Sequence, residues 1–355
     1  MRCFMSKDIS LKFSRKVTIV SFILSVFVMY IHAKNLAYYD FGDAHGTLIH
    51  VLNQIMSETF GRVAVPFFFL QSGYWMFRYD IFEAKSGVLK GKLKKKVISL
   101  GIPYLLWNTL GLLVFLLVTR IPGMPFRIYD GQVVGLTWNN ILQGVFLSKF
   151  YFPFWFMRDL IVLTAVSPVL VRFLRNRYMA YASIIILFIL SVWDINAPVC
   201  QTNSVLLFMV GGVLSVYHRE YWENSSENHL ETAVYVIVFL ILAVLKWREI
   251  PFAHTIFSVL SPILFWKICD LMGQIRVFDR EPSWFCKQSF FIYSAHIFPV
   301  EALSSILSKV NRSMVWASFS YMVTPLIVLA LLYVAAKILA RRFPKVYGLL
   351  CGNRT

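Results

Sequence analysis

The sequence predicts an all-α membrane protein with about ten transmembrane helices and both termini in the cytoplasm. Its 355 residues are 58% hydrophobic and only 15% charged, which is too little polar surface to cover a water-soluble particle of this size. Apolar runs of about 16 to 23 residues alternate with short clusters rich in Lys and Arg, as in polytopic helical membrane proteins. These two observations exclude a soluble enzyme.

The predicted spans follow one another along a single domain that covers residues 1–355. Each is long enough to cross a hydrocarbon core of roughly 30 Å if modest tilt is allowed. The first follows a basic N-terminal stretch, as in a signal peptide, but it lacks a small-x-small cleavage site, so we expect an uncleaved helix. In chain order the spans are 17–33, 61–77, 97–119, 152–171, 178–194, 203–218, 231–247, 252–272, 284–302 and 316–340.

The distribution of Lys and Arg predicts the orientation. With the N-terminus inside, 25 of the 35 basic residues lie on the cytoplasmic side, as the positive-inside rule requires. The cytoplasmic parts are then the tails 1–16 and 341–355 and the basic loop 78–96, whereas the loop 120–151 is extracytoplasmic. The net charge of +17 is therefore a consequence of membrane orientation, and no nucleic-acid partner is expected.

Cysteine usage predicts neither a metal site nor a disulfide framework. The five cysteines form no CxxC pair and have no histidine at metal-ligand spacing. In the predicted topology Cys200 is the only cysteine on the extracytoplasmic face, so no intramolecular disulfide is expected there.

Ionisable residues within membrane spans are energetically costly and are therefore candidates for function, and four of them stand out. They are His32, Arg62, Arg158 and His296. In the predicted orientation all four lie toward the outer leaflet, on four different helices, which predicts a shared site. The structural alternatives are an interfacial position for His32, snorkelling of Arg62 and interhelical hydrogen bonds for His296.

Helical periodicity gives the two histidines polar neighbours. Ser21 and Ser25 fall within about 40° of His32 around the first helix, which predicts a face turned toward a cavity. In the ninth helix Tyr293 shares a face with His296, so the pair is a candidate either for hydrogen bonds between helices or for direct chemistry.

Two further patterns lie in the fourth and second helices. Arg158 is followed by Asp159, but adjacent helical residues do not face each other, so we expect each to have another partner. Gln71, Ser72 and Gly73 form a small polar break near mid-membrane, which predicts close backbone packing or the lining of a cavity.

The loop 78–96 has seven basic residues, and two explanations of them stay open. The first is membrane topology together with binding of anionic lipid. The second is recognition of the phosphates of a nucleotide-like cofactor by the run Lys92, Lys94, Lys95 and Lys96. The sequence GVLKGK in this loop is not a phosphate-binding loop, because it is one residue short, lacks the following Ser or Thr and has no preceding strand.

Five segments in this order resemble the acyltransferase 3 family of integral membrane O-acyltransferases. Together they span nearly the whole chain, and the similarity is greatest to single-domain members that modify exported bacterial polysaccharides. The segments are VFVMYIHA, GRVAVPFFFLQSGYW, KLKKKVISLGIPYLLWN, FPFWFMRDLIVLTAVSPVL and FFIYSAHIF.

The resemblance implies transfer of an acyl group, usually acetyl from acetyl-CoA, to a hydroxyl of a lipid-linked or exported glycan. It also implies a multi-pass protein of the bacterial inner or plasma membrane, with no tightly bound cofactor and no metal; homo-oligomerisation stays open. The family's helix-one histidine corresponds to His32. The family usually has Arg or Lys eleven residues earlier, where this chain has Ser21, so no role can be assigned to that cation.

The implied chemistry suits the candidate residues. A sugar hydroxyl is too weak an acid to attack a thioester unaided, so His32 is the expected general base, with a transient acyl-histidine as an open alternative. Arg62 or Arg158 would stabilise the oxyanion, and Tyr293 and His296 would orient the acceptor or relay protons. The CoA phosphates would bind near Lys92, Lys94, Lys95 and Lys96.

Two functions of other classes remain as alternatives. One is a transporter or flippase of a lipid-linked saccharide without acyl-transfer activity, although no inverted repeat is visible in the hydropathy pattern. The other is a catalytically silent assembly subunit whose polar residues only hold helices together.

Overall fold

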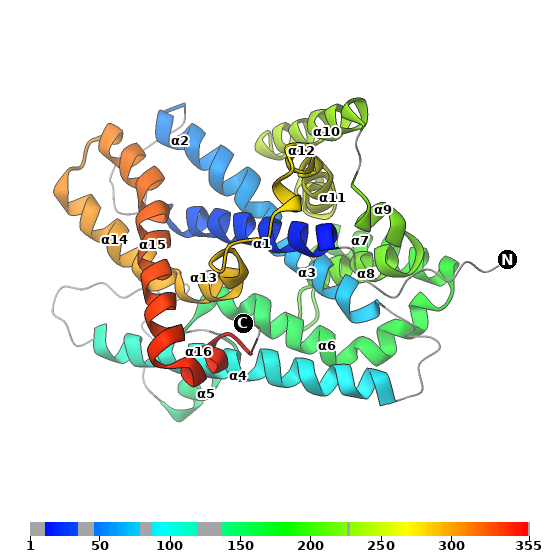
Figure 1. Ribbon diagram of the computed structural model, residues 1–355, viewed down its shortest axis with the longest axis horizontal. Coiled ribbons are helices and arrows are strands. Elements are labelled where there is room, and N and C mark those ends of the chain that lie inside the picture. The colour runs from blue at the N-terminus through cyan, green and yellow to red at the C-terminus, as the bar shows by residue number, and fades with distance from the viewer. Residues whose placement is uncertain are drawn as a thin grey trace.

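The protein is α-helical, as predicted. The computed structural model describes residues 11–34, 46–78, 87–118, 137–148, 150–225 and 228–353, apart from the side chains of 87–90, 92 and 140. Within these ranges the elements are helices, short 3-10 turns, a π-helical segment and an isolated bridge between Ala197 and Cys200. Figure 1 shows these helices gathered around α1, which contacts α3, α13, α14 and α15.

The helices begin and end as follows. The first half comprises α1 Leu11–His32, α2 Leu48–Asn53, the π-helix η2 Gln54–Gly61, α3 Arg62–Phe77, α4 Gly87–Val118, α5 Trp138–Phe146, η3 Phe152–Phe154, α6 Trp155–Leu174 and α7 Arg177–Val192. The second half comprises α8 Thr202–Tyr217, α9 Arg219–Glu223, α10 His229–Trp247, α11 Ala253–Ile268, α12 Asp270–Gln274, η4 Val277–Asp279, η5 Cys286–Gln288, α13 Ser289–Ala295, α14 Ile297–Val310, α15 Met314–Arg342 and α16 Pro344–Leu350.

Each predicted span coincides with helix. Among the described residues, six helical stretches are long and apolar enough to cross a membrane, and the bent pair of α13 and α14 makes a seventh if it is one span. The helices α7 and α8 are apolar but only 16 residues long, or about 24 Å at the α-helical rise. The structure thus supports a helical membrane protein with at least these candidate spans.

Polar caps determine where several helices begin. The side chain of Asn176 accepts hydrogen bonds from the backbone N–H groups of the second and third residues of α7, and Asn228 does the same for α10. Thr47 and Ser313 cap α2 and α15 in the same manner. These side chains satisfy backbone donors that have no partner within the helix.

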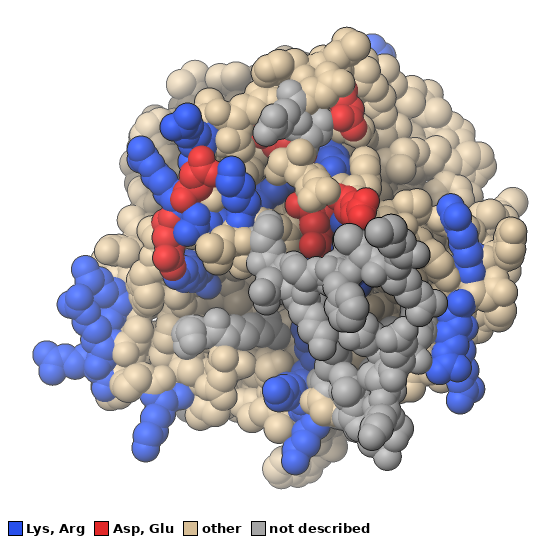
Figure 2. Space-filling model, turned by 45° about the vertical axis from the view of Figure 1, so that its right-hand side comes forward, with Lys and Arg blue, Asp and Glu red and all other residues tan. Residues whose placement is uncertain are grey.

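Buried ion pairs hold the helices together at the end of the molecule where α1 begins. Lys16 Nζ lies 2.5 Å from Asp270 Oδ1, with both side chains at most 3% exposed, and 3.8 Å from the centre of the Trp266 ring. Arg78 pairs with Glu223 at 2.6 Å. Figure 2 brings this end forward and shows many Lys and Arg side chains with fewer Asp and Glu. Lys16, the lysine of α1 that is nearest to Ser21 in the sequence, thus has a structural role as the partner of Asp270.

Two glycines allow α3 and α8 to pack with their backbones in close contact. A Cβ atom on Gly73 would lie 2.0 Å from the carbonyl oxygen of Phe208, and one on Gly211 would lie 1.9 Å from that of Leu70. Small residues at such crossings favour association of membrane helices. The predicted role of Gly73 in close packing is therefore confirmed.

We expect Gly211→Leu to destabilise the protein by about 2 kcal/mol or more, because the new side chain would force α8 away from α3. Gly101→Leu is the matched control, since nothing lies within 4 Å of a Cβ at Gly101. The measurement is thermal unfolding of both variants in detergent. An equal midpoint for the two would contradict this account of the packing.

Candidate active site

The two histidines predicted from sequence lie together in the structure. His32 is the last residue of α1, and His296 lies between α13 and α14. The centres of their rings are 5.0 Å apart, and the ring of Phe152 lies 5.1 Å from that of His32 on another side. His32 is half-buried, whereas His296 is fully buried. Two imidazoles from separate helices thus form one pair.

His296 has a defined tautomer. Its Nδ1 lies 2.6 Å from the backbone carbonyl of Tyr293, and a carbonyl only accepts hydrogen bonds, so Nδ1 carries the proton. Its Nε2 is therefore an acceptor, and it is buried without a hydrogen-bond partner in the described part of the chain. A buried lone pair of this kind can take up a proton from a neighbouring group.

The segment 284–302 is not the single straight helix predicted. The helix bends by 66° between α13 and α14, at His296. Pro299 explains the break, because it has no N–H to donate to the carbonyl of Ala295 and its ring would clash with that carbonyl. The amide of Val300 donates to the His296 carbonyl at 3.0 Å, so α14 starts anew at this residue.

Two tyrosines fix this bend to the segment that precedes α6. The Tyr293 hydroxyl donates to the carbonyl of Pro153, and the Tyr151 hydroxyl donates to the carbonyl of Ser294. The rings of Tyr293 and Phe154 stack with centres 6.0 Å apart. The hydroxyl of Tyr293 has one proton, and the hydrogen bond to Pro153 uses it. Toward a reacting group this hydroxyl can therefore act only as a hydrogen-bond acceptor.

The expectation that Arg158 and Asp159 would not pair with each other was wrong, although Asp159 also has the further partners expected for it. Arg158 Nε and one terminal nitrogen lie 3.1 and 2.9 Å from Asp159 Oδ1. The three methylenes of Arg158 let its guanidinium fold back, although the two Cβ atoms point in different directions. Asp159 also accepts hydrogen bonds from the Gln201 amide at 3.0 Å and the Ser204 hydroxyl at 2.9 Å. This buried carboxylate therefore holds α6 against the start of α8.

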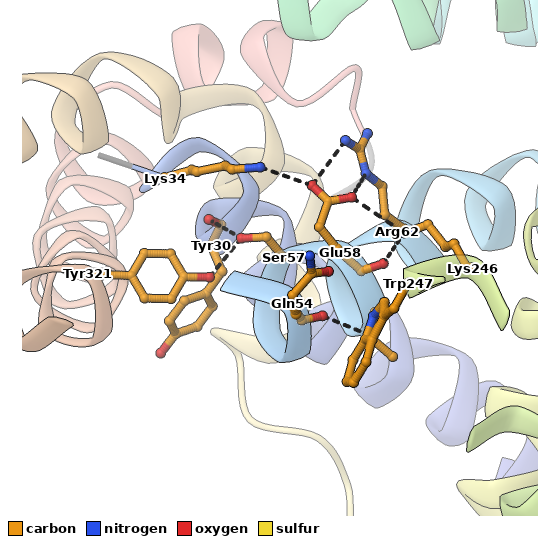
Figure 3. A network of polar contacts seen from close by, with 10 residues as sticks. Tyr30, Lys34, Gln54, Ser57, Glu58, Arg62, Lys246, Trp247 and Tyr321 are labelled. Carbon is orange, nitrogen blue, oxygen red and sulfur yellow. Dashed lines mark hydrogen bonds and ion pairs between the residues drawn. The ribbon is translucent and has the colours of Figure 1, made fainter. Parts of the chain in front are cut away.

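Arg62 belongs to a network centred on Glu58, which Figure 3 shows. Arg62 Nε lies 3.1 Å from Glu58 Oε2, and Lys34 and Lys246 approach the same carboxylate at 3.3 and 3.4 Å. Glu58 precedes the predicted span 61–77. Burial raises the pKa of its carboxyl, but Arg62, Lys246 and Lys34 lower it more strongly, and the result is a pKa of about 2. Glu58 is therefore ionised at neutral pH.

The π-helix η2 gives Glu58 and its neighbour Ser57 their positions. The Thr59 hydroxyl bonds to the carbonyl of Gln54, five residues earlier, as the wider turn allows. Ser57 donates to the carbonyl of Tyr30 and shares a hydrogen bond of 2.7 Å with the Tyr321 hydroxyl. The π segment thereby connects α1, α15 and the Glu58 network near His32.

A cavity of about 630 Å³ is lined by both arginines. We call it the outer cavity, because the predicted topology places Arg62 and Arg158 toward the outer leaflet. Its wall includes Arg62 on α3 and Arg158 on α6, with Lys246 and His254 from α10 and α11. The wall also includes Ile31, the neighbour of His32 in the chain, and Phe152, which contacts the His32 ring. His32 itself is not among the described residues that line the cavity, but Ile31 and Phe152 place the cavity next to it.

A second cavity of about 160 Å³ lies next to Tyr293, whose ring centre is 6.1 Å from that of His296. We call it the inner cavity, because the predicted topology places it on the cytoplasmic side of the first. Tyr293 lines it at one point and Lys96 at another. Gln71 also lines it, and both polar atoms of its side chain are buried without a partner in the described ranges. Its remaining polar lining comes from Ser21, Ser25, Ser72 and Ser289. The predicted polar face of the first helix and the predicted polar break after residue 70 thus line one cavity.

Part of the basic run lies at the far end of this inner cavity. Lys95 and Lys96 line an open hollow of about 470 Å³, which shares Trp75 and Lys96 with the inner cavity. Lys94 is exposed on the same helix, and the side chain of Lys92 lies outside the described residues. The open hollow beside the basic run thus adjoins the inner cavity at Trp75 and Lys96.

Three residues near the site were missed by the sequence analysis: Glu58, Lys246 and His254. Glu58 lies in a loop predicted to be outside the membrane, and Lys246 lies at a predicted helix end, where a lysine is ordinarily a topology signal. Their predicted depth in the membrane could have identified them, because the predicted topology places all three at the same depth as Arg62.

The sequence of this chain is similar to known proteins over most of its length. The family described as Acyltransferase domain matches residues 19–334. A relative, the Succinoglycan biosynthesis protein ExoH of Rhizobium meliloti (strain 1021), is 22% identical over 317 residues, which cover 86% of this chain and 82% of that protein. No solved structure matches.

We expect Asp159→Asn to destabilise the protein by about 2 kcal/mol, because it leaves Arg158 without its charged partner and weakens two further hydrogen bonds. The exposed Glu220→Gln is the control with the same chemical change. Thermal unfolding in detergent is the measurement. In the double variant with Arg158→Gln, the loss should be smaller than the sum of the two single losses; simple additivity would show that the pair is not coupled.

Proposed function

This chain belongs to the acyltransferase domain family that matches residues 19–334, and on that premise we propose that it transfers an acyl group from a CoA thioester to a hydroxyl of a glycan. The observation that carries the proposal is the pair of His32 and His296, with ring centres 5.0 Å apart, whose neighbours Phe152 and Tyr293 line the outer and the inner cavity. The name of the relative refers to succinoglycan biosynthesis, which supports a glycan acceptor. Acetyl is the acyl group that the family resemblance favours.

In the proposed mechanism His32 acts as general base. Its imidazole takes the proton of the acceptor hydroxyl as the oxygen attacks the thioester carbonyl, and the carbonyl π electrons move to oxygen. Collapse of the tetrahedral intermediate breaks the carbon–sulfur bond, and the departing CoA sulfur takes the proton from the imidazolium. The buried Nε2 lone pair of His296 supports a role for this second ring in holding or relaying that proton.

Arg158 is the better placed of the two arginines for the oxyanion. A guanidinium has five N–H donors, and the contacts with Asp159 use its Nε and one terminal nitrogen. Other donors therefore remain for a developing negative charge in the outer cavity, and Asp159 fixes their direction. Arg62 is 47% exposed and held by Glu58, which favours a role in binding the acceptor.

The donor would reach the histidine pair from the inner side. Lys95 and Lys96 would bind the CoA phosphates at the open hollow, and the pantetheine arm would lie in the inner cavity. The amide groups of pantetheine need hydrogen-bond partners, and the unpartnered amide of Gln71 would supply both a donor and an acceptor. The acceptor would enter through the outer cavity, so that the two substrates approach the same pair of rings.

This arrangement agrees with the topology that the sequence predicts. We infer ten spans with both termini cytoplasmic, in the inner or plasma membrane of a bacterium. The donor side then faces the cytoplasm, where acyl-CoA is made, and the acceptor side faces outward. The distribution of Lys and Arg supports this orientation.

We expect His32→Ala to lower kcat for acyl transfer by about 100-fold or more, because the hydroxyl loses its general base. His229→Ala is the control, since it changes an exposed histidine at the start of α10. The measurement is transfer of labelled acetyl from acetyl-CoA to a glycan acceptor by the purified protein. Undiminished transfer in His32→Ala would refute the role of His32, and glycan transport without any transfer would favour a flippase.

We expect Gln71→Leu to raise the KM for acyl-CoA about tenfold, because the pantetheine amides lose a partner in a buried site. The KM for the acceptor is the internal control and should change less than twofold. Steady-state kinetics with each substrate varied in turn provides both values. A rise in the acceptor KM instead would place the acceptor, not the donor, in the inner cavity.

A further inference from the structure

Glu58 is surrounded by more positive charge than it can neutralise. Lys34, Arg62 and Lys246 all lie within 3.4 Å of its carboxylate. In Figure 3 the three cations approach Glu58 from α10, from the first turn of α3 and from the residues that follow α1. One carboxylate facing three cations leaves an excess of two positive charges in this network.

Lys246 is the most buried of the three cations. Its side chain is 9% exposed, compared with 44% for Lys34 and 47% for Arg62. Its ammonium also donates to the backbone carbonyl of Glu58 and lies 5.3 Å from the centre of the Phe257 ring. A charge with so little access to water is stabilised strongly by a nearby anion.

Two of the three cations, Arg62 and Lys246, line the outer cavity, and Glu58 does not contribute to its wall. Arg62, Arg158 and Lys246 are among the described residues that line this cavity, and those lining residues include no Asp or Glu. Neutral donors and acceptors complete the wall, and the side-chain oxygen of Asn203 has no hydrogen-bond partner among the described residues. A ligand in the cavity therefore meets positive charge together with polar groups that can orient it.

We propose that Lys246 and Arg62 form a binding site for a carboxylate of one of the two substrates. The inference rests on the proposed acyl transfer and adds a substrate class to it. Two sources of this group fit a cavity whose wall also includes Phe152, the neighbour of His32. It is either the far carboxylate of a dicarboxylic acyl group such as succinyl, or the carboxylate of an acidic sugar in the acceptor.

The kinetic test compares Lys246→Gln with Arg248→Gln, which removes the same charge from an exposed residue two positions later. Acetyl-CoA and succinyl-CoA are each assayed with a neutral and with a uronate-bearing oligosaccharide. We expect Lys246→Gln to raise KM about tenfold for the anionic substrate only, with transfer between neutral substrates changed less than twofold. The variant Lys246→Arg keeps the positive charge, so its KM for the anionic substrate should equal that of the wild type.

The affected substrate identifies the source of the carboxylate. A change confined to succinyl-CoA assigns the site to the acyl group, and a change confined to the uronate oligosaccharide assigns it to the acceptor. Equal effects of Lys246→Gln on neutral and anionic substrates, or no effect on either, would overturn the proposal.

A binding measurement separates this inference from the proposed function. Free succinate and free glucuronate are titrated into the purified protein in detergent, and the shift of the thermal midpoint is recorded. Stabilisation by either anion that persists in Arg248→Gln and is lost in Lys246→Gln supports the carboxylate site, even if no acyl transfer is detected. If neither anion stabilises the wild-type protein and the KM values show no selective change, the site does not exist.

Discussion

The break between α13 and α14 determines where the candidate site lies. A continuous helix through Pro299 would have kept the His296 backbone in the helical hydrogen-bond ladder, whereas the 66° bend leaves its ring between Tyr293 and His32. Tyr293 and Tyr151 anchor the bend to the segment just before α6, so two parts of the chain that are distant in sequence fix its geometry together. In a membrane, a helix break of this kind persists only where the protein satisfies the backbone groups that it frees.

The same demand for partners explains how the charged residues are arranged. An unpaired charge within a membrane protein is costly, and here carboxylates hold cations at both ends of the bundle. At the end of the molecule where α1 begins, Asp270 forms an ion pair with Lys16, and Glu223 forms one with Arg78. These contacts join helices. Near the histidine pair the balance differs, because Glu58 has three cationic partners. That local excess of positive charge is what distinguishes the proposed carboxylate site from the two structural ion pairs.

The sequence predicts the helical class, the positions of the helices and the common depth of the two histidines. Those features follow from hydropathy and from the distribution of Lys and Arg, which are properties of single segments. The bend at His296, the pairing of Arg158 with Asp159 and the approach of Lys246 to Glu58 were not predicted. Each depends on the reach of a long side chain or on the residues that a neighbouring helix places nearby. The periodicity of residues along one helix contains neither kind of information.

Glycines show the same division between local and tertiary information. The polar break around Gly73 indicates close packing, but only the structure identifies α8 as the partner and Gly211 as the matching position. Ser21 differs, because helical periodicity along the first helix already predicts that its face is turned toward a cavity, and the structure places Ser21 and Ser25 in the wall of the inner cavity.

The central claim is that the two substrates meet at His32 and His296. The most direct measurement is an experimental structure of the protein with a non-hydrolysable acyl-CoA analogue. We expect the carbonyl carbon of the analogue within about 4 Å of a His32 ring nitrogen, a distance that allows for the intervening hydroxyl, with its pantetheine arm in the inner cavity beside Gln71. An analogue bound with its acyl end outside both cavities, or far from the two rings, would contradict the account.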